Sequence, residues 1–323
     1  MEPGPLTVDK IRERAVPRRG RNRNRAGGRR EALTGYLFVA PAVLLFAVLG
    51  LYTIGYGLAL SVHEWNGITP TWTWAGLDNF RDLLWAVPSL ADSTKNALGR
   101  TLAVMVGAAV PTVLISLALA LALNSVGRIR GFLQTLYFLP YVTTGIAVFY
   151  AWRFILLPDG ALNSVLETVG LDFLVEPEGF LGNPETALWT TTGVLVWGMV
   201  PLGVLLYLSA LQSIDDAVLE AARLDGASAW KIATRIVWPM LRPTTALLVV
   251  LVLRGVLQEF QIFLLMTNGG PLDRTTTLPL LAYNYAFGRD AVYYGYASAL
   301  GWLLFLFSVA LAALTFVVLR RRT

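Results

Sequence analysis

The sequence contains no cysteine and only one histidine, His63, among its 323 residues. The absence of cysteine excludes disulfides, thiolate metal sites and cysteine nucleophiles. A lone imidazole is more often a hydrogen-bonded loop residue than a catalytic base, and no HExxH motif or nucleophile elbow accompanies it. The sequence therefore predicts that the chain is not an enzyme and holds no metal.

A nucleotide-binding motif is also missing. The chain has only three lysines, and none of them closes a GxxxxGK(S/T) phosphate-binding loop: Lys10, Lys95 and Lys231. We therefore expect no cofactor in this chain. Any step that uses ATP must rely on a separate subunit.

Charged residues are scarce, at 15% of the chain, whereas hydrophobic residues make up 55%. A soluble domain carries about 25% charged residues, so the composition predicts a membrane protein. A helix needs about 20 apolar residues to cross the hydrocarbon core. Six segments are long enough, which predicts an all-α polytopic protein with six transmembrane helices: 36–62, 97–123, 132–157, 188–211, 244–266 and 295–319.

The basic residues are unevenly distributed along the chain. Ten of the 26 Lys and Arg residues lie in residues 1–34, a segment with little apolar content that we expect to be disordered and to contact lipid rather than nucleic acid. The loop near 124–131, the segment 220–243 and the C-terminal end carry most of the others on the same side. The positive-inside rule makes that side cytoplasmic, with both termini. The loops on the other side are too short to form a separate ligand-binding domain.

Polar residues interrupt the fifth apolar segment. Arg254, Gln258, Glu259 and Gln261 all lie well inside it. An Arg near the bilayer centre costs about 3 kcal/mol, so these groups must face protein or water. Two interpretations of these residues remain open: they line a translocation pathway, or they form a structural network between helices. Near the outer ends of other segments, Arg100 and Arg153 are expected to reach the lipid headgroups.

The segment 220–243 is half polar in an otherwise apolar chain. Asp215 and Asp216 precede it and predict the capped start of a short helix. Gly226 then permits a turn, and a second helical pattern ends or kinks at Pro239 and Pro243. From the residues alone, both an ordinary amphipathic loop and a docking element for another protein remain open.

The spacing E-A-A-x-x-D-G-A, followed by Ile236 and Pro239, resembles the signature loop of permease subunits in binding-protein-dependent ABC importers. The resemblance extends from about residue 33 to the end, through "YLFVAPAVLLF", "WAGLDNFRDLL" and "MTNGGPLDRTTTL". These segments are similar to the first permease subunit of maltose-type and glycerol-phosphate-type carbohydrate importers. The resemblance implies the type I ABC importer permease fold over residues 35–323, with a cytoplasmic coupling loop at 212–243.

The same resemblance implies partners and sites. A second related permease would complete a heterodimer, two cytoplasmic ATPase subunits would bind ATP and Mg²⁺, and an extracytoplasmic sugar-binding protein would deliver an oligosaccharide or a polyol phosphate. The location implied is the bacterial cell membrane. The docking residues implied for the ATPase are Glu220, Ala221, Ala222, Asp225, Gly226, Ile236 and Pro239. The expected substrate-pathway residues are Tyr150, Trp197, Gln258, Glu259 and Gln261.

A second hypothesis is an ion-coupled secondary transporter that uses Arg254 and Glu259. It predicts transport by this chain without an ATPase. It also predicts an inverted repeat of helices, and the sequence shows no such repeat.

Overall fold

The computed structural model describes residues 25–126, 130–143, 145–288 and 293–320. The chain divides into two compact units, Met1–Tyr56 and Gly57–Thr323. Nearly all regular structure in the described ranges is helical, which confirms the all-α prediction. The exception is a small antiparallel hairpin of β1 (His63–Glu64) and β2 (Thr73–Trp74).

The first unit contains α1 (Arg25–Leu45), η2 (Phe46–Leu51) and the beginning of α2 (Tyr52–Ser61). Residues 1–24 of the expected disordered tail lie outside the described residues. The part that is described corrects the expectation, because α1 already begins at Arg25. A helix propagates easily into flanking Arg, Glu and Ala residues once it is nucleated. An apolar span follows from Leu33 to Ser61, in agreement with the first predicted segment.

The second unit is a helical bundle. Its helices are α3 (Asp78–Arg81), η3 (Asp82–Ala86), α4 (Pro88–Ser125), α5 (Arg130–Thr143), α6 (Ile146–Ile155), α7 (Ala161–Thr168), η4 (Asp172–Leu174), α8 (Ala187–Gln212), α9 (Asp216–Leu224), α10 (Ala229–Ile232), η5 (Ala233–Val237), α11 (Trp238–Met240), α12 (Arg242–Gln258), α13 (Gln261–Met266), α14 (Leu278–Phe287) and α15 (Tyr294–Arg320).

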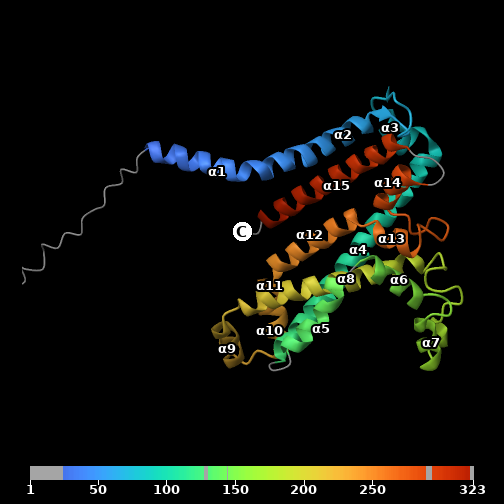
Figure 1. Cartoon of the computed structure of the whole chain (residues 1–323). Coiled ribbons are helices and arrows are strands. Elements are labelled where there is room, and N and C mark those ends of the chain that lie inside the picture. The colour runs from blue at the N-terminus through green and yellow to red at the C-terminus, as the bar shows by residue number, and fades with distance from the viewer. Residues whose placement is uncertain (1–24, 127–129, 144, 289–292, 321–323) are drawn as a thin grey trace, which may run out of the picture. The chain divides into compact units, whose positions relative to one another are not determined.

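The centre of this unit is the packing of α4 against α8 and α12 (Figure 1). Lipid tails are as apolar as the core, so helices in a membrane associate through close packing and hydrogen bonds rather than through the hydrophobic effect. Ser116 and Gly203 show how this happens. The Ser116 hydroxyl donates to the carbonyl oxygen of Val200 at 3.0 Å, and both Ser116 and Gly203 lie where the two helices approach closely.

We expect Gly203→Ala to lower the melting temperature of the purified protein. A Cβ at this position would overlap the Ser116 hydroxyl oxygen and would lie 3.0 Å from a methyl carbon of Leu248. Overpacking of this kind costs about 1–3 kcal/mol. The matched control is Gly198→Ala on the same helix, where a Cβ meets nothing within 4 Å. Equal melting temperatures of the two variants would contradict the packing described here.

The count of six continuous transmembrane helices is not confirmed. Among the described residues, four helices are long and apolar enough to cross a membrane, or five if the pair 229–240 and 242–258, bent by 65°, is one span. The predicted segment 132–157 is divided between α5, which ends at Thr143, and α6, which begins at Ile146. The predicted segment 244–266 is divided between α12 and α13. Hydropathy measures apolar content and does not detect such breaks.

The loops of the second unit gather at its two ends. Figure 1 shows α9 and α10 at one end of the bundle and α3 and α7 at the opposite end. This separation agrees with the alternation of loops that the sequence predicts on the two sides of a membrane. It places segment 220–243 far from the hairpin and from the loop that contains α7.

Candidate functional site

The segment between α8 and α12 begins with a capped helix. The Asp215 carboxylate accepts a hydrogen bond from the amide of Ala217 at 2.9 Å, which confirms the predicted N-cap of α9. At the other end, the amide of Ala227 donates to the Ala222 carbonyl at 3.0 Å and that of Gly226 donates to the Arg223 carbonyl at 3.0 Å. These two bonds form a Schellman motif. Gly226 has a φ of 76°, which confirms the predicted turn.

The second helical run starts at a further cap and ends at a bend. The Ser228 hydroxyl accepts from the amide of Lys231 at 3.3 Å, and the helix continues through η5 to Met240. It then meets α12 at an angle of 65°, with Pro239 and Pro243 on either side of the bend. The predicted helix, turn, helix and proline break are therefore all present.

The expected docking residues do not all lie on one surface. Glu220, Ala221, Asp225 and Gly226 are exposed, whereas Ala222 is buried. Ile236 and Pro239 are half-buried. Ala222 therefore packs within this chain, where a small side chain permits close approach. Ile236 lies in η5 and Pro239 in α11, after the turn at Gly226.

Sequence reasoning missed two exposed apolar side chains in this segment. Leu224 is 89% exposed and Trp230 is 78% exposed, the first at the end of α9 and the second in α10. Residues three apart share a helix face, so Leu224 lies beside Ala221 while Ala222 faces the chain's own core. The sequence did contain a signal for the exposed leucine: Leu224 is two positions after Ala222 and therefore falls on a different face of the helix. Exposed large apolar groups on a polar rim are typical of a protein interface.

The polar part of the fifth segment lies at the break between α12 and α13. Glu259 follows the last residue of α12 in an extended conformation, and its carboxylate accepts from the Ile262 amide of α13 at 3.0 Å. The carboxylate thus satisfies a backbone donor that the break leaves unpaired. Arg254, Gln258 and Gln261 are exposed on the surface of the single chain.

The other two expected pathway residues line two separate cavities. Tyr150 lies in a cavity of about 840 Å³ between α6, α13 and α14, together with Asn268, Tyr283, Asn284 and Tyr285. Trp197 lies in a cavity of about 460 Å³ and contacts Trp152 edge to face, with ring centroids 5.3 Å apart. Gln258, Glu259 and Gln261 are not among the described residues that line either cavity. The structure therefore does not bring the five residues into one site within this chain.

Both arginines near the outer ends of apolar segments hydrogen-bond to protein. Arg100 donates to the carbonyl of Thr276 at 3.4 Å, and Arg153 donates to the carbonyl of Leu265 at 3.4 Å. Each also lines a cavity. We expected both side chains to reach the lipid headgroups. Instead, both contact backbone carbonyls in distant segments of the chain.

Apolar spans, polar residues at a break between two apolar helices, and an exposed helical loop are together typical of a membrane transport subunit. Residues 77–323 match the family of binding-protein-dependent transport system inner membrane components. The match covers more than half of the chain, and the chain belongs to this family. The family confirms the prediction of a membrane-embedded permease subunit that is not itself an enzyme.

Individual relatives agree with this assignment. The lactose transport system permease protein LacF of Rhizobium radiobacter is 31% identical over 295 residues, which cover 90% of this chain and 95% of LacF. The multiple sugar-binding transport system permease protein MsmF of Streptococcus mutans is 29% identical over 272 residues, covering 84% and 90%. A crystal structure of a bacterial ABC transporter involved in the import of alginate, an acidic polysaccharide, is also similar. Its matching chain has a TM-score of 0.75 at 25% identity, covering 91% of this chain and 97% of that one.

Proposed function

We propose that this chain is the permease subunit of an ATP-driven sugar importer and that it forms half of the translocation pathway. The observation that carries the proposal is the capped α9–Gly226–α10 loop, with exposed Leu224 and Trp230, at the end of the bundle opposite the hairpin. A carbohydrate substrate is supported by the names of the relatives, among them the lactose permease LacF and the trehalose/maltose permease MalF of Thermococcus litoralis.

The α9–α10 loop is proposed to dock on a cytoplasmic ATPase subunit, which would carry the ATP and Mg²⁺. Leu224 and Ala221 offer an apolar surface, while Glu220 and Asp225 offer charges around it. Apolar anchors at the centre with a charged rim are the usual anatomy of an interface. The caps at both ends of α9 make the loop rigid enough to transmit a displacement into α12 across the bend.

A second, related permease is proposed to cover the polar surface of α12 and α13. Arg254, Gln258 and Gln261 are exposed in the single chain at membrane depth. Lipid contact there would cost about 3 kcal/mol for the arginine alone, so protein or water must face them. A heterodimer of this chain and the second permease, with a polar pathway between them, provides both the protein and the water that these side chains require. Glu259 and the cavities with Tyr150 and Trp197 would then belong to the pathway.

The loop is proposed to lie in the cytoplasm of a bacterial cell, with both termini on that side and lipid around the bundle. The support is the concentration of Lys and Arg in the tail, the segment 220–243 and the C-terminal end. An extracytoplasmic binding protein would deliver sugar to the opposite end. Dependence on such a protein is a property of the family.

Ion-coupled transport by this chain alone is not favoured. The family to which the chain belongs depends on a binding protein. The structure also uses the Glu259 carboxylate to cap α13 rather than to pair with Arg254.

Reconstitution in proteoliposomes tests the proposed function. We expect sugar uptake only when this chain is combined with a second permease, the ATPase subunits, ATP and the binding protein. Omission of the ATPase should reduce uptake to background. Uptake by this chain alone, driven by an ion gradient, would overturn the proposal.

Removing the N-cap of α9 should weaken docking by a measurable amount. Asp215→Ala leaves the Ala217 amide without its acceptor and costs about 1 kcal/mol of helix stability. We expect about a fivefold lower affinity for the ATPase. Asp215→Asn, which keeps an acceptor oxygen, should bind within about twofold of wild type. The affinity is measured by co-purification with increasing amounts of the ATPase. An equal loss of affinity in both variants would show that the charge of Asp215, rather than its capping hydrogen bond, matters.

A further inference from the structure

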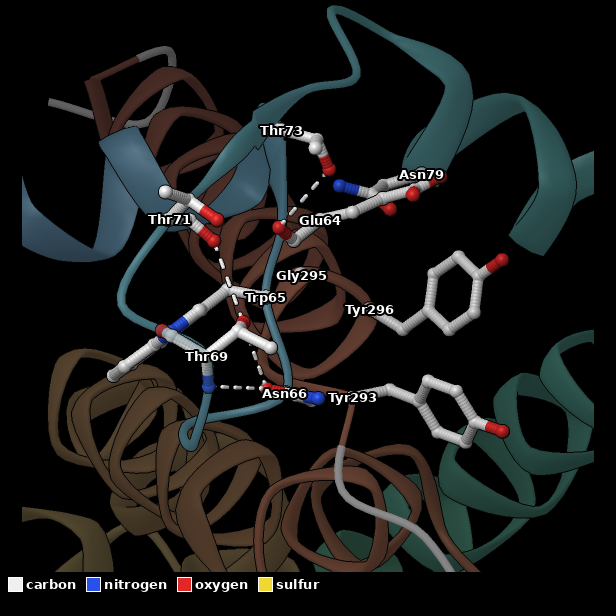
Figure 2. Close-up of a pocket in the computed structure, with 10 residues that line it drawn as sticks. All are labelled: Glu64, Trp65, Asn66, Thr69, Thr71, Thr73, Asn79, Tyr293, Gly295 and Tyr296. Carbon is white, nitrogen blue, oxygen red and sulfur yellow. Dashed lines mark hydrogen bonds between the residues drawn. The ribbon is translucent and has the colours of Figure 1, made fainter.

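A cavity at the hairpin end of the bundle is not part of either site described above. It has a volume of about 490 Å³ and lies between the β1–β2 hairpin, the buried Asn79 of α3 and the first turn of α15 (Figure 2). Pockets of about 300–1,000 Å³ are typical of small-molecule sites. The described residues that line it are Glu64, Trp65, Asn66, Thr69, Thr71, Thr73, Asn79, Tyr293, Gly295 and Tyr296.

The walls of the cavity are held in place by buried contacts. The side-chain nitrogen Nδ2 of Asn79 donates to the carbonyl oxygens of Ser61 at 2.9 Å and His63 at 3.0 Å. The Tyr294 amide donates to the Trp65 carbonyl at 3.2 Å, so the hairpin is tied directly to the start of α15. Gly295 permits this approach, since a Cβ there would lie 2.5 Å from the carbonyl oxygen of His63. A preformed site binds at a lower entropic cost than a mobile one.

Aromatic rings form one wall. Tyr293 and Tyr296 extend side by side from the start of α15, with ring centroids 5.7 Å apart (Figure 2). The Tyr296 hydroxyl donates to the Asp82 carboxylate at 3.0 Å, which fixes its ring. Trp65 packs between Trp72 and Tyr294, at 5.5 and 5.2 Å. Broad aromatic faces suit the C–H face of a sugar ring, which is apolar although its edge carries hydroxyls.

Polar groups surround the rings. Asn66 accepts from the amides of Ile68 and Thr69, both at 3.0 Å, so its side chain is fixed. Three threonine side chains and Glu64 complete the set. Glu64 is the only charged group among the described residues that line the cavity. A carboxylate accepts hydrogen bonds from neighbouring hydroxyls and repels anions, so the site favours an uncharged, hydroxyl-rich ligand over a uronate or a phosphate.

The cavity adjoins the larger one that contains Tyr150, because Tyr293 lines both. A ligand in the outer cavity would come nearest to the proposed pathway at Tyr293. A monosaccharide needs only one of the two spaces. A longer saccharide would have to pass Tyr293 to occupy both.

We propose that the outer cavity is a binding subsite for one neutral pyranose unit of an oligosaccharide, and that Tyr293 joins this subsite to the translocation pathway. The proposal rests on the proposed function and makes it more specific. It assigns this permease to uncharged oligosaccharides rather than to acidic saccharides or polyol phosphates. It also gives the hairpin a role in substrate selection by chain length.

Uptake by the reconstituted full complex tests the subsite. The probes are a size series of neutral gluco-oligosaccharides from one to five units and a matched series of oligogalacturonates. Tyr293→Ala and Trp65→Ala should raise the apparent KM for three or more units at least tenfold and leave that for one or two units within about twofold. Glu64→Lys should shift preference towards the oligogalacturonates. Trp85→Ala, an exposed tryptophan that does not line the cavity, is the control.

Two further readouts distinguish a sugar subsite from a docking surface for the binding protein. Gly295→Ala should give the same length-dependent defect by displacing the hairpin, whereas Gly301→Ala, where a Cβ meets nothing within 4 Å, should not. Stimulation of ATP hydrolysis by the unliganded binding protein should stay unchanged in all variants. Loss of that stimulation, or an equal rise in KM at every length, would make the cavity a docking surface and overturn the subsite. If the wild-type complex takes up no sugar, the proposed function fails as well.

Discussion

Replacing Gly226 by valine is expected to reduce ATP-driven uptake at least tenfold. Gly226 occupies the left-handed position after α9, with a φ of 76°. A side chain with a Cβ in that conformation costs about 1–2 kcal/mol, and a β-branched one more, so the Schellman turn should rearrange. The rearrangement would displace Leu224 and Trp230 relative to one another. Because the ATPase would have to recognise both, roughly tenfold weaker docking is the lower bound.

The chain contains a matched control for this variant. Gly170 follows α7 with a φ of 75° and the same pair of bonds, from Leu171 to the Leu166 carbonyl at 2.8 Å and from Gly170 to the Glu167 carbonyl at 3.1 Å. A Cβ at either glycine meets nothing within 4 Å, so the strain in the two variants is alike. Gly170→Val should keep uptake within about twofold. The measurement is initial uptake normalised to the amount of inserted protein. Equal losses would mean that strain, not docking, explains the effect.

The second large effect is expected at Glu259. Glu259→Ala removes the acceptor for the Ile262 amide at the break between α12 and α13. A buried donor left without a partner costs about 1–3 kcal/mol, and more where water is absent. We expect a loss of uptake of at least tenfold together with a lower melting temperature. The control is Gln258→Ala, which alters an exposed neighbouring side chain and should leave the melting temperature unchanged.

The conservative variant distinguishes this role from ion coupling. Glu259→Gln keeps an oxygen that can accept from Ile262 but removes the ionisable group. A helix-capping role predicts uptake within about threefold of wild type. A proton-coupled transporter requires the carboxylate, and loss of uptake in Glu259→Gln with a normal melting temperature would favour that alternative. Uptake is to be measured at two pH values so that a missing proton step becomes visible.

Local signals in the sequence predict the structure of the α9–α10 loop correctly. Asp215 and Gly226 act through bonds to residues within five positions of them, so neighbouring residues suffice to predict the cap and the turn. The spacing of prolines likewise predicts the bend at the start of α12. That the loop docks on an ATPase stays a prediction, since the structure contains one chain.

The breaks in the apolar segments could not be predicted from hydropathy. Gly145 and Glu259 both lie within long segments that are mostly apolar, so the hydropathy averaged over a window stays high across each break. The sequence pattern predicts one continuous helix over 244–266 with Glu259 inside it, whereas the Glu259 carboxylate accepts a hydrogen bond from the amide of Ile262 at a break in that segment. A carboxylate just before the start of a helix is a capping signal. Inside an apolar segment with no visible helix start, the same carboxylate fits a residue of a translocation pathway equally well.

The hairpin cavity could not be predicted from the sequence for a different reason. Trp65 and Tyr293 lie far apart in the chain, and only the packing of the hairpin on α15 brings them to one cavity. The sequence contains aromatic residues in both loops, a pattern that is typical of interfacial anchors. Position in space, not residue type, makes them candidates for sugar binding.

The central claim is that the α9–α10 loop contacts an ATPase on the cytoplasmic side. The chain has no native cysteine, so single cysteines can be introduced without further changes. Leu224→Cys, at a position 89% exposed, is compared with Phe173→Cys, 79% exposed in η4, which follows α7, the helix at the opposite end of the bundle in Figure 1. In the assembled complex, a short bifunctional thiol–amine reagent should cross-link Leu224→Cys to the ATPase. It should form no cross-link between Phe173→Cys and the ATPase. In whole cells, an impermeant maleimide should label only Phe173→Cys. Labelling of Leu224→Cys from outside, or cross-linking of the ATPase to Phe173→Cys, would contradict the account.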